Sequence, residues 1–592
     1  MSFRLPRPLA LALALLLGSC ATAPPPPPLA PAAPPARVDS APATPRSVAP
    51  ASRVEALLAG LSLEDKVGQV MMVGFGGPRV DGAVEALVRG HRVGGVCLFK
   101  RNIVDGEQVA RLNADLRALL AGGVPPFLTV DQEGGSVVRV KDGVVVLPGN
   151  MALGATRSAE LAYAAGRAQG EDLKRLGFNM NLAPVLDVNL NPRNPVIGSR
   201  SYGDSAALVS ELGRAFVRGQ QDAGLVTVAK HFPGHGATDA DSHTALPILR
   251  ASRAEVLAQM EPFRDAVREG LDGLMTAHVA MPALTGDDVP ATLHPQLLTG
   301  LLREQLGFGG LVLTDELEMD AVARRYGVGQ AAVLALVAGA DMVLVPWRAE
   351  AKAEVYAALL SAARSGELAP ERLDEAVRHI LTAKERRGLF TPAPTTSIPA
   401  PRGPDDARAH EEVAHRIARA AVTLLRSQGG LFPLEPQARV GVITAEASLG
   451  AAIAERAPHT RVLDVPAWPS RAERAGLRRR ARQVALGADV VVVGLVNAHQ
   501  LEFVREVARA GRPVVVVALG LPYLAERALE ARVVLAVYSS QPAATEAAAA
   551  ALFGEIGTPG RLPVGLSRLT FGHGLEAPRR EQARVGAPAP AP

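Results

Sequence analysis

The 592-residue sequence contains little cysteine, no large excess of charge and no long apolar run at its N-terminus. Its two cysteines, Cys20 and Cys97, are too few to argue a disulfide framework. Lys and Arg total 63 against 59 Asp and Glu, so a net charge of +4 gives little electrostatic support for binding nucleic acid. The run Leu9–Leu17 is too short to span a bilayer. What remains is a chain that is 48% hydrophobic and too long for one compact domain.

The N-terminus has the pattern of a targeting segment. Arg4 and Arg7 precede the apolar run, and small residues then lead to Cys20. This order predicts a lipoprotein signal peptide over residues 1–20, with Cys20 lipidated and the mature protein exported and anchored to a membrane. Ala21 rather than aspartate follows the cysteine, which favours the outer membrane, facing the periplasm, if the source is Gram-negative. The alternative is an ordinary signal peptide that is cleaved nearby.

Composition divides the rest of the chain. Residues 21–51 are rich in Pro and Ala, favour extended polyproline conformations and are predicted to be a tether. A domain long enough for a TIM barrel is expected over 52–390, and a Pro-rich linker over 391–412. A second α/β domain is expected over 413–570, followed by a disordered tail over 571–592.

Alternating β-branched runs and amphipathic stretches in 52–390 predict a (β/α)8 TIM barrel. The eight predicted strands are Val67–Phe75, Val93–Phe99, Pro126–Val130, Met180–Leu186, Val226–Lys230, Gly273–Ala277, Leu311–Thr314 and Met342–Val345. Helices are predicted between most of them, at Ser158–Leu176, Ala206–Ala223, Arg253–Glu269 and Gln330–Ala338.

The second unit repeats the alternation of strand and helix. Its predicted strands are Val440–Thr444, Val462–Val465, Val490–Val496, Val514–Leu519 and Val533–Tyr538. These continuous hydrophobic runs indicate a smaller domain with a mostly parallel sheet that is covered on both faces.

Polar residues gather where the barrel strands are predicted to end. Six lie at or just past a C-terminal strand end: Asp131, Asp187, Lys230, His231, His278 and Asp315. Active sites of TIM barrels lie on this rim, so the six residues are candidates for the site. Asp187 and His278 could instead cap loops.

The segment 230–243, KHFPGHGATDADSH, allows two readings. His231, His235 and His243 with Asp239 or Asp241 could bind a metal, although the spacing matches no common zinc pattern closely. Alternatively, Asp241 could orient His243 and stabilise its protonated form, which would make the histidine an acid/base catalyst.

Asp315 ends an apolar strand and could attack an anomeric carbon as a carboxylate nucleophile. Its neighbour Glu316 is expected outside the pocket, because successive strand residues point to opposite faces. The competing interpretation is that Asp315 caps the following helix.

Five segments of this chain resemble glycoside hydrolase family 3, in particular its β-N-acetylglucosaminidases in a two-domain form. They are VDQEGG at 130–135 with Arg139, IGSRSY at 197–202, KHFPGHG at 230–236, the Asp241-Ser242-His243 dyad segment and the Thr314-Asp315 strand end. The order and spacing of the five agree over roughly residues 52–390. VTLLRSQGGLFPL at 422–434 and GTPGRLPV at 557–564 resemble the entry to and the end of the family's second domain.

The resemblance implies roles for individual residues. Asp315 would form a covalent glycosyl-enzyme, and His243, paired with Asp241, would replace the usual carboxylic acid/base. The residues that would bind the sugar at the non-reducing end are Asp131, Arg139, Arg200, Lys230 and His231. No metal and no organic cofactor is implied.

The expected activity is retaining, exo-acting hydrolysis of terminal β-linked GlcNAc from muropeptides, chitooligosaccharides or related glycans. Phosphate could replace water as the acceptor. The alternatives are a family 3 β-glucosidase or β-xylosidase, a catalytically inactive lipoprotein that binds the cell wall, and a metal-dependent hydrolase.

Overall fold

The computed structural model describes residues 52–391, 403–577, 579 and 580. The predicted signal peptide with Cys20 and the predicted tether lie outside these residues. Within the described ranges, no helix is both long enough and apolar enough to cross a membrane.

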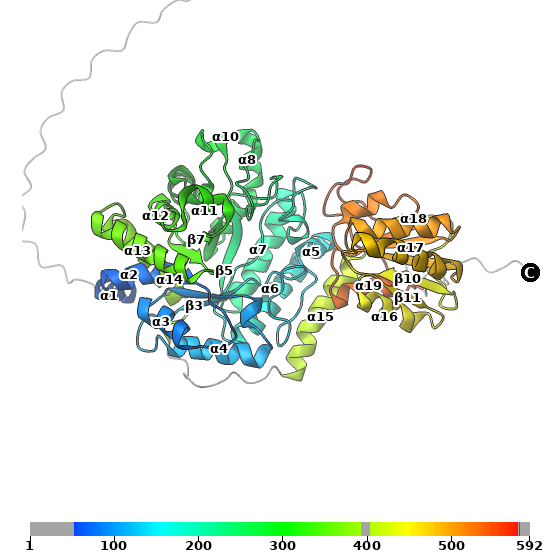
Figure 1. Ribbon diagram of the computed structural model, residues 1–592, viewed down its shortest axis with the longest axis horizontal. Coiled ribbons are helices and arrows are strands. Elements are labelled where there is room, and N and C mark those ends of the chain that lie inside the picture. The colour runs from blue at the N-terminus through cyan, green and yellow to red at the C-terminus, as the bar shows by residue number, and fades with distance from the viewer. Residues whose placement is uncertain (1–51, 392–402, 578, 581–592) are drawn as a thin grey trace, which may run out of the picture. The chain divides into compact units, whose positions relative to one another are not determined.

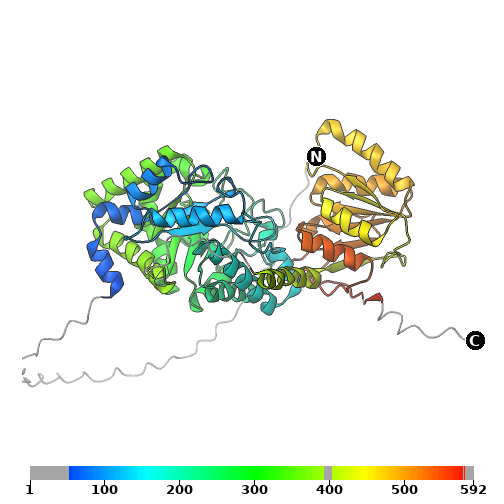
Figure 2. The same ribbon diagram turned by 90° about the horizontal axis from the view of Figure 1, so that it is seen from below.

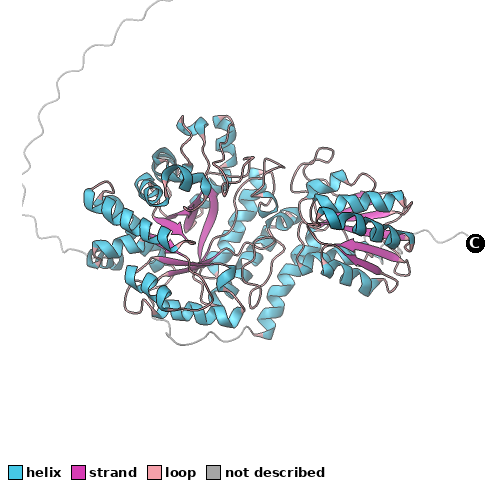
Figure 3. Cartoon of the chain, viewed as in Figure 1, coloured by secondary structure: helices cyan, strands magenta, loops and turns pink. Residues whose placement is uncertain are grey.

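The first domain is a closed barrel of eight parallel strands in the order β1 to β8, as predicted (Figures 1 and 3). The strands are β1 Met71–Val73, β2 Gly95–Leu98, β3 Phe127–Val130, β4 Met180–Asn181, β5 Val226–Phe232, β6 Gly273–Thr276, β7 Leu311–Glu316 and β8 Met342–Val345. Their side chains are almost all buried, because helices cover the outside of the barrel and side chains fill the inside.

Helices precede the first strand and connect most of the others. They are α1 Arg53–Gly60, α2 Leu63–Gln69, α3 Gly82–His91, α4 Gly106–Ala118, α5 Asn150–Thr156, α6 Ala159–Arg175, α7 Ala206–Asp222, α8 Arg253–Gln259, α9 Glu261–Arg268, α10 Pro282–Thr285, α11 Asp320–Tyr326, α12 Val328–Ala338, α13 Ala349–Ser365 and α14 Pro370–Arg386, with a π-helix at Gln296–Gln305. Side-chain caps fix many of their starts. Ser158 and Ser205, for example, accept hydrogen bonds from the first turns of α6 and α7.

Strand β4 ends at Asn181 and not at Leu186 as predicted, and two other predicted elements of the barrel differ in kind from the structure. Val67–Phe75 was predicted as one strand, but Ser62 and Asp65 form a capping box that starts helix α2, and the strand begins only at Met71. The predicted helix Arg253–Glu269 is two helices, because the chain breaks at Met260 and Pro262 stands in the first turn of α9.

The second domain contains a six-stranded sheet in the order β11-β10-β12-β13-β14-β9. Its elements are α15 Pro404–Ala421, β9 Thr423–Ser427, β10 Val440–Thr444, α16 Ala447–Arg456, β11 Arg461–Asp464, α17 Arg471–Leu486, β12 Val490–Leu495, α18 Leu501–Arg509, β13 Val514–Ala518, β14 Val533–Ala536 and α19 Pro542–Leu552. Helices α17 and α18 cover one face of the sheet and α16 and α19 the other (Figures 1 and 2). The predicted mostly parallel sheet is confirmed. Strand β9, which pairs antiparallel with β14, was not predicted.

The structure describes part of the predicted linker and part of the predicted tail. Helix α15 begins at Pro404, within the segment 391–412, because Pro at the first helical position and two aspartates after it favour a helix start. Residues 571–577 are ordered: Gly572 donates to the carbonyl of Leu562, and Leu575 pairs with Leu424 of β9.

Candidate active site

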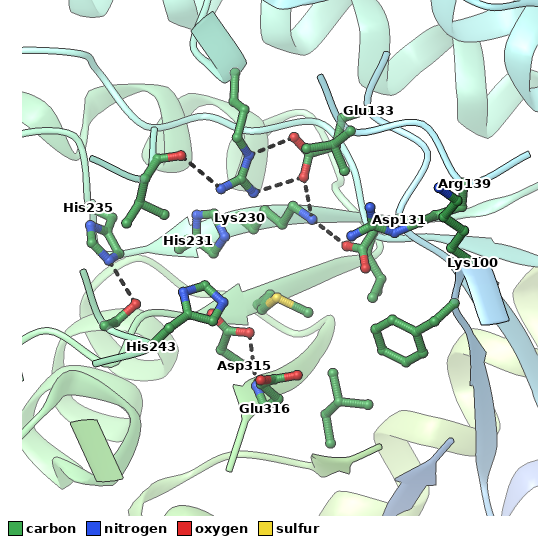
Figure 4. Close-up of a pocket in the computed structure, with 18 of the residues that line it drawn as sticks. Lys100, Asp131, Glu133, Arg139, Lys230, His231, His235, His243, Asp315 and Glu316 are labelled. Carbon is green, nitrogen blue, oxygen red and sulfur yellow. Dashed lines mark hydrogen bonds and ion pairs between the residues drawn. The ribbon is translucent and has the colours of Figure 1, made fainter. Parts of the chain in front are cut away.

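The C-terminal ends of the barrel strands surround a cavity of about 510 Å³ (Figure 4). Of the eight residues to which the family resemblance gave catalytic or sugar-binding roles, all but Asp241 line this cavity: Asp131, Arg139, Arg200, Lys230, His231, His243 and Asp315. Asp241 contacts it through His243. Residues from five different loops or strand ends therefore meet in one place, although the structure does not test the roles predicted for them.

The floor of the cavity is a buried group of ion pairs. Lys230, on β5, has its Nζ 2.6 Å from Oδ1 of Asp131 and 2.7 Å from Oε1 of Glu133. Arg200 donates to both carboxylate oxygens of Glu133, at 2.8 and 2.9 Å. Burial by itself would raise the pKa of Glu133, but the Arg200 guanidinium and the Lys230 ammonium hold this pKa well below its ordinary value. These groups present fixed charges and donors to a polar ligand.

Glu133 has no role in the sequence-based prediction. Its motif was recognised, but its partner Arg200 is 67 residues away along the chain, and nothing local shows that the two meet. Gln132 shapes the same loop: its side chain donates to the carbonyl of Val140 and accepts from the backbone N–H groups of Arg139 and Val140. The loop therefore folds back and places Arg139 at the cavity.

Asp187 is a support for two histidines of the loop that follows β5. Its buried carboxylate has Oδ2 2.7 Å from Nδ1 of His231, and its Oδ1 accepts from the backbone N–H of His235 at 2.6 Å. His278 is also buried, between the hydroxyl of Thr292 and the carbonyl of Glu316. Neither Asp187 nor His278 lines the cavity, so both fit the supporting alternative that the sequence left open.

Asp241 and His243, which were predicted to act as a pair, are in contact. Nδ1 of His243 lies 2.7 Å from Oδ1 of Asp241, and the same oxygen accepts from the backbone N–H of His243 at 2.9 Å. Burial would raise the pKa of Asp241, but hydrogen bonds from His243 outweigh it and lower this pKa. An ionised Asp241 orients the ring, so that Nε2 is the nitrogen available to a ligand.

Asp315 lies at the end of β7 and lines the cavity. Burial would raise its pKa, but electrostatic interactions with His231 and His278 and a hydrogen bond from the backbone N–H of Glu316 lower it below the ordinary value. Asp315 therefore presents a carboxylate at neutral pH. It does not cap helix α11, whose N-cap residue is Met319.

Glu316 also lines the cavity, contrary to the expectation from strand alternation. The register of β7 against β8 shifts between Leu313 and Glu316, and this irregularity breaks the strict alternation of side chains. Burial and the neighbouring charge of Asp315 raise the pKa of Glu316 to about 7. The indole N–H of Trp347 donates to Oε2 of Glu316 at 2.6 Å.

The ring of Trp347 forms an aromatic wall of the cavity, and this residue was not among those predicted from the sequence. It lies just past the end of β8 at the same rim, where a search for aromatic as well as polar residues would have found it. The Arg101 guanidinium lies 4.1 Å from the centre of its ring, and the ring of Phe99 lies 4.6 Å away. Nearly half of Trp347 stays exposed at the cavity, which gives a ligand an apolar surface beside charged groups.

The histidines of 230–243 do not converge as a metal site would require. Each uses a ring nitrogen within the protein: His231 with Asp187, His235 with Thr238 and Ser242, and His243 with Asp241. Across the residues that the structure describes, no three His, Cys, Asp or Glu side chains are grouped to hold a metal ion.

Comparison with known proteins identifies the first domain. The model of the glycosyl hydrolase family 3 N terminal domain matches residues 62–383, more than half of the chain. The chain belongs to glycosyl hydrolase family 3. This membership agrees with the family resemblance of the five sequence segments.

Similar proteins within the family bear hexosaminidase names. Beta-hexosaminidase A of Pseudoalteromonas piscicida is 32% identical over 379 residues, which cover 60% of this chain and 62% of that protein. A beta-N-acetylglucosaminidase/beta-glucosidase of Cellulomonas fimi is 31% identical, over 64% of this chain and 67% of its own. The match therefore spans about two thirds or less of the length of these two relatives.

A solved structure resembles both domains of this chain. The family 3 beta-N-acetylglucosaminidase of Paenibacillus sp. str. FPU-7 is 38% identical and superposes with a TM-score of 0.80. The superposition covers 86% of this chain and 99% of that one. The two-domain form of the family is thus present here.

Proposed function

We propose that this family 3 chain is an exo-acting, retaining β-N-acetylglucosaminidase. The observation that carries the proposal is the meeting of Asp315 and the Asp241–His243 dyad at one cavity whose floor is charged and buried. The likeness to the Paenibacillus β-N-acetylglucosaminidase over almost the whole of that protein supports the same substrate class.

The proposed reaction is a double displacement. Asp315 attacks the anomeric carbon while His243 donates a proton to the departing glycosidic oxygen, which leaves a glycosyl ester on Asp315 and neutral His243. His243 then takes a proton from water, the oxygen of which attacks the anomeric carbon and displaces Asp315. The lowered pKa of Asp315 favours the ionised nucleophile that the first step requires.

The proposed sugar contacts are the charged groups of the cavity floor. Asp131 and Lys230 are placed to bind hydroxyl groups, with Arg139, Arg200 and His231 beside them. The buried pair of Glu133 and Arg200 also lines the cavity. Exo action is part of the proposal through the family resemblance alone.

The central experiment is covalent trapping. A 2-deoxy-2-fluoro glycosyl fluoride should inactivate the enzyme and leave a glycosyl adduct on the peptide that contains Asp315, measured by mass spectrometry. Asp315→Asn should lower kcat by a factor on the order of 10⁴. Asp374→Asn, on helix α14 away from the cavity, is the matched control. An adduct elsewhere, or an active Asp315→Asn, would overturn the assignment; inactive wild-type protein that still binds glycans would favour the wall-binding alternative.

Substrate choice is tested by comparing chromogenic GlcNAc, glucose and xylose glycosides. We expect GlcNAc to be preferred in kcat/KM. A preference for glucose would favour the β-glucosidase alternative. The name of the Cellulomonas relative includes both activities. GlcNAc–MurNAc fragments and chitobiose, each with and without phosphate, would then separate muropeptides from chitooligosaccharides and hydrolysis from phosphorolysis.

We also propose that the protein is exported and lipid-anchored through Cys20. This proposal rests on the sequence pattern at residues 1–20 alone. Labelling with a fatty-acid analogue in the native host should mark the wild-type protein but not Cys20→Ala. Equal labelling of both would refute lipidation at this cysteine.

A further inference from the structure

The loop that carries the Asp241–His243 dyad is exposed and is held at one buried point. Of residues 239–246, all of which the structure describes, Ser242 alone is buried, with 2% of its surface exposed. The side chains of Asp241 and His243 on either side of it are 37% and 57% exposed. The contacts that hold Ser242 in place therefore also position its two neighbours, Asp241 and His243.

Ser242 is tethered on two sides. Its hydroxyl lies 3.1 Å from Nε2 of His235 (Figure 4), and its backbone carbonyl accepts from the N–H of Ala321 at 3.3 Å. Ala321 is in the first turn of helix α11, which follows the strand that ends with Asp315 and Glu316. The second tether thus ties the dyad loop to the segment that follows the nucleophile.

His235 is itself rigidly placed. It is 2% exposed, its backbone N–H donates to Asp187, and its Nδ1 lies 2.8 Å from Oγ1 of Thr238. The hydroxyl of Thr238 donates to the carbonyl of His235, and Asn194 donates to the same Oγ1. One lone pair of Thr238 Oγ1 is then left, and Nδ1–H of His235 fills it.

This arrangement assigns the tautomer of His235. Burial lowers its pKa to about 4, so the ring is neutral at neutral pH and carries one N–H. With the proton on Nδ1, Nε2 is an acceptor, and the hydroxyl of Ser242 donates to it. Every member of the chain Asp187, His235, Thr238 and Ser242 then has a suitable partner.

We propose that His235 is a positioning residue of the acid/base, and that it acts through Ser242 to hold the Asp241–His243 dyad at the nucleophile. The inference rests on the proposed function. Because Asp187 also fixes His231, one buried carboxylate supports both the sugar-binding side and the dyad loop. A displacement of the acid/base by about 1 Å can lower the rate on the order of 100-fold.

The test is a series of GlcNAc glycosides with leaving groups of increasing basicity. A loss of acid catalysis slows poor leaving groups and spares good ones, whereas a general structural fault slows both alike. Ser242→Ala removes only the hydroxyl. We expect its kcat/KM to fall about 10-fold to 100-fold on chitobiose and to stay within about 2-fold on the dinitrophenyl glycoside. Ser242→Thr, which restores a hydroxyl, should recover most of the loss.

Two further variants serve as controls, one for the loop and one for the acid/base itself. Asp239→Ala, an exposed change in the same loop, should leave the leaving-group dependence unchanged. His243→Ala should also lose more kcat/KM on poor leaving groups than on good ones, and the difference should be larger than for Ser242→Ala. If His243→Ala is impaired and Ser242→Ala is not, the positioning role of His235 is overturned and the acid/base assignment stands. If the loss of kcat/KM in His243→Ala does not depend on the leaving group, the assignment of His243 as the acid/base is wrong. The positioning role of His235 is then wrong as well.

Discussion

Nζ of Lys230 lies 2.7 Å from Oε1 of Glu133, with 3% and 2% of the two side chains exposed. This ammonium and carboxylate are the most deeply buried opposite charges at the cavity floor, and Arg200 shares the same carboxylate. Removing one charge from such a group leaves its partners with less compensation in a medium where water solvates them poorly.

Glu133→Gln keeps the shape of the side chain and removes its charge. We expect it to lower the free energy of unfolding by about 3–5 kcal/mol and to raise KM for GlcNAc glycosides, because Lys230 and Arg200 lose their shared anion. Urea unfolding and initial rates measure the two effects. Glu160→Gln, at an exposed pair with Arg416, should change stability by less than about 1 kcal/mol. An equally small effect of Glu133→Gln would mean that the floor does not depend on this charge.

Glu316→Gln tests the raised pKa of Glu316. In the folded protein this pKa is about 7, against an ordinary value of 4.5, so the ionised form is disfavoured by folding. Its penalty is absent below pH 4.5, grows up to pH 7 and is constant above. We therefore expect Glu316→Gln to have a higher Tm than the wild type at pH 8 and the same Tm at pH 4. Glu350→Gln on helix α13 is the exposed control, and a pH-independent difference would contradict the shift.

Lys384 lies at the opposite end of the barrel, fully buried, with its Nζ 2.9 Å from Oε1 of Gln69 and 4.9 Å from the ring centre of Phe127. Burial lowers its pKa well below the ordinary value. The unfolded chain therefore binds a proton that the folded protein holds less well, and stability rises with pH up to about 10. Lys384→Met should raise Tm at pH 6 more than at pH 10. A Tm that falls at both pH values would show that the bond to Gln69 outweighs the cost of burying the amine.

Asp341, just before β8, has no exposed surface and binds four donors or cations: Arg303, Arg372, His379 and the backbone N–H of Val312. Burial would raise the pKa of Asp341, but Arg303 leads the groups that lower it to about 2. Its contribution to stability is thus complete above pH 4 and is lost as the pH falls towards 2. Asp341→Asn should lower the free energy of unfolding by about 3–5 kcal/mol at pH 7. Asp489→Asn, an exposed partner of Arg439, is the control.

Treatment with a strong chelator tests the metal-dependent alternative. Since each histidine of 230–243 directs at least one ring nitrogen to a protein group, we expect kcat and KM to be unchanged after incubation with excess EDTA and gel filtration. A loss of activity that zinc or another divalent cation restores would contradict this reading.

The fold was predictable because its signals are local. Each barrel strand is a short apolar run, and a charged or polar residue such as Asp131 or Asp315 marks where it ends. The errors also have local causes. The capping box at Ser62 turned an apolar stretch into a helix, and the irregularity in β7 brought Glu316 into the cavity.

The parts of the site that could not be predicted depend on contacts between distant segments. Glu133 meets Arg200 across 67 residues, and Asp187 joins two loop histidines through its own two oxygens. Periodicity and turn chemistry carry no information about such pairs. Trp347 differs, because its position after β8 was visible in the sequence and was overlooked.

The polar groups buried around Lys384 and Asp341 lie at the end of the barrel where the strands begin, while the cavity lies where the strands end. The length of the barrel separates the two sets, and they share no side chain. An engineer could therefore adjust the heat resistance of this enzyme from one end and its choice of glycan from the other, and combine the two kinds of substitution with nearly additive effects.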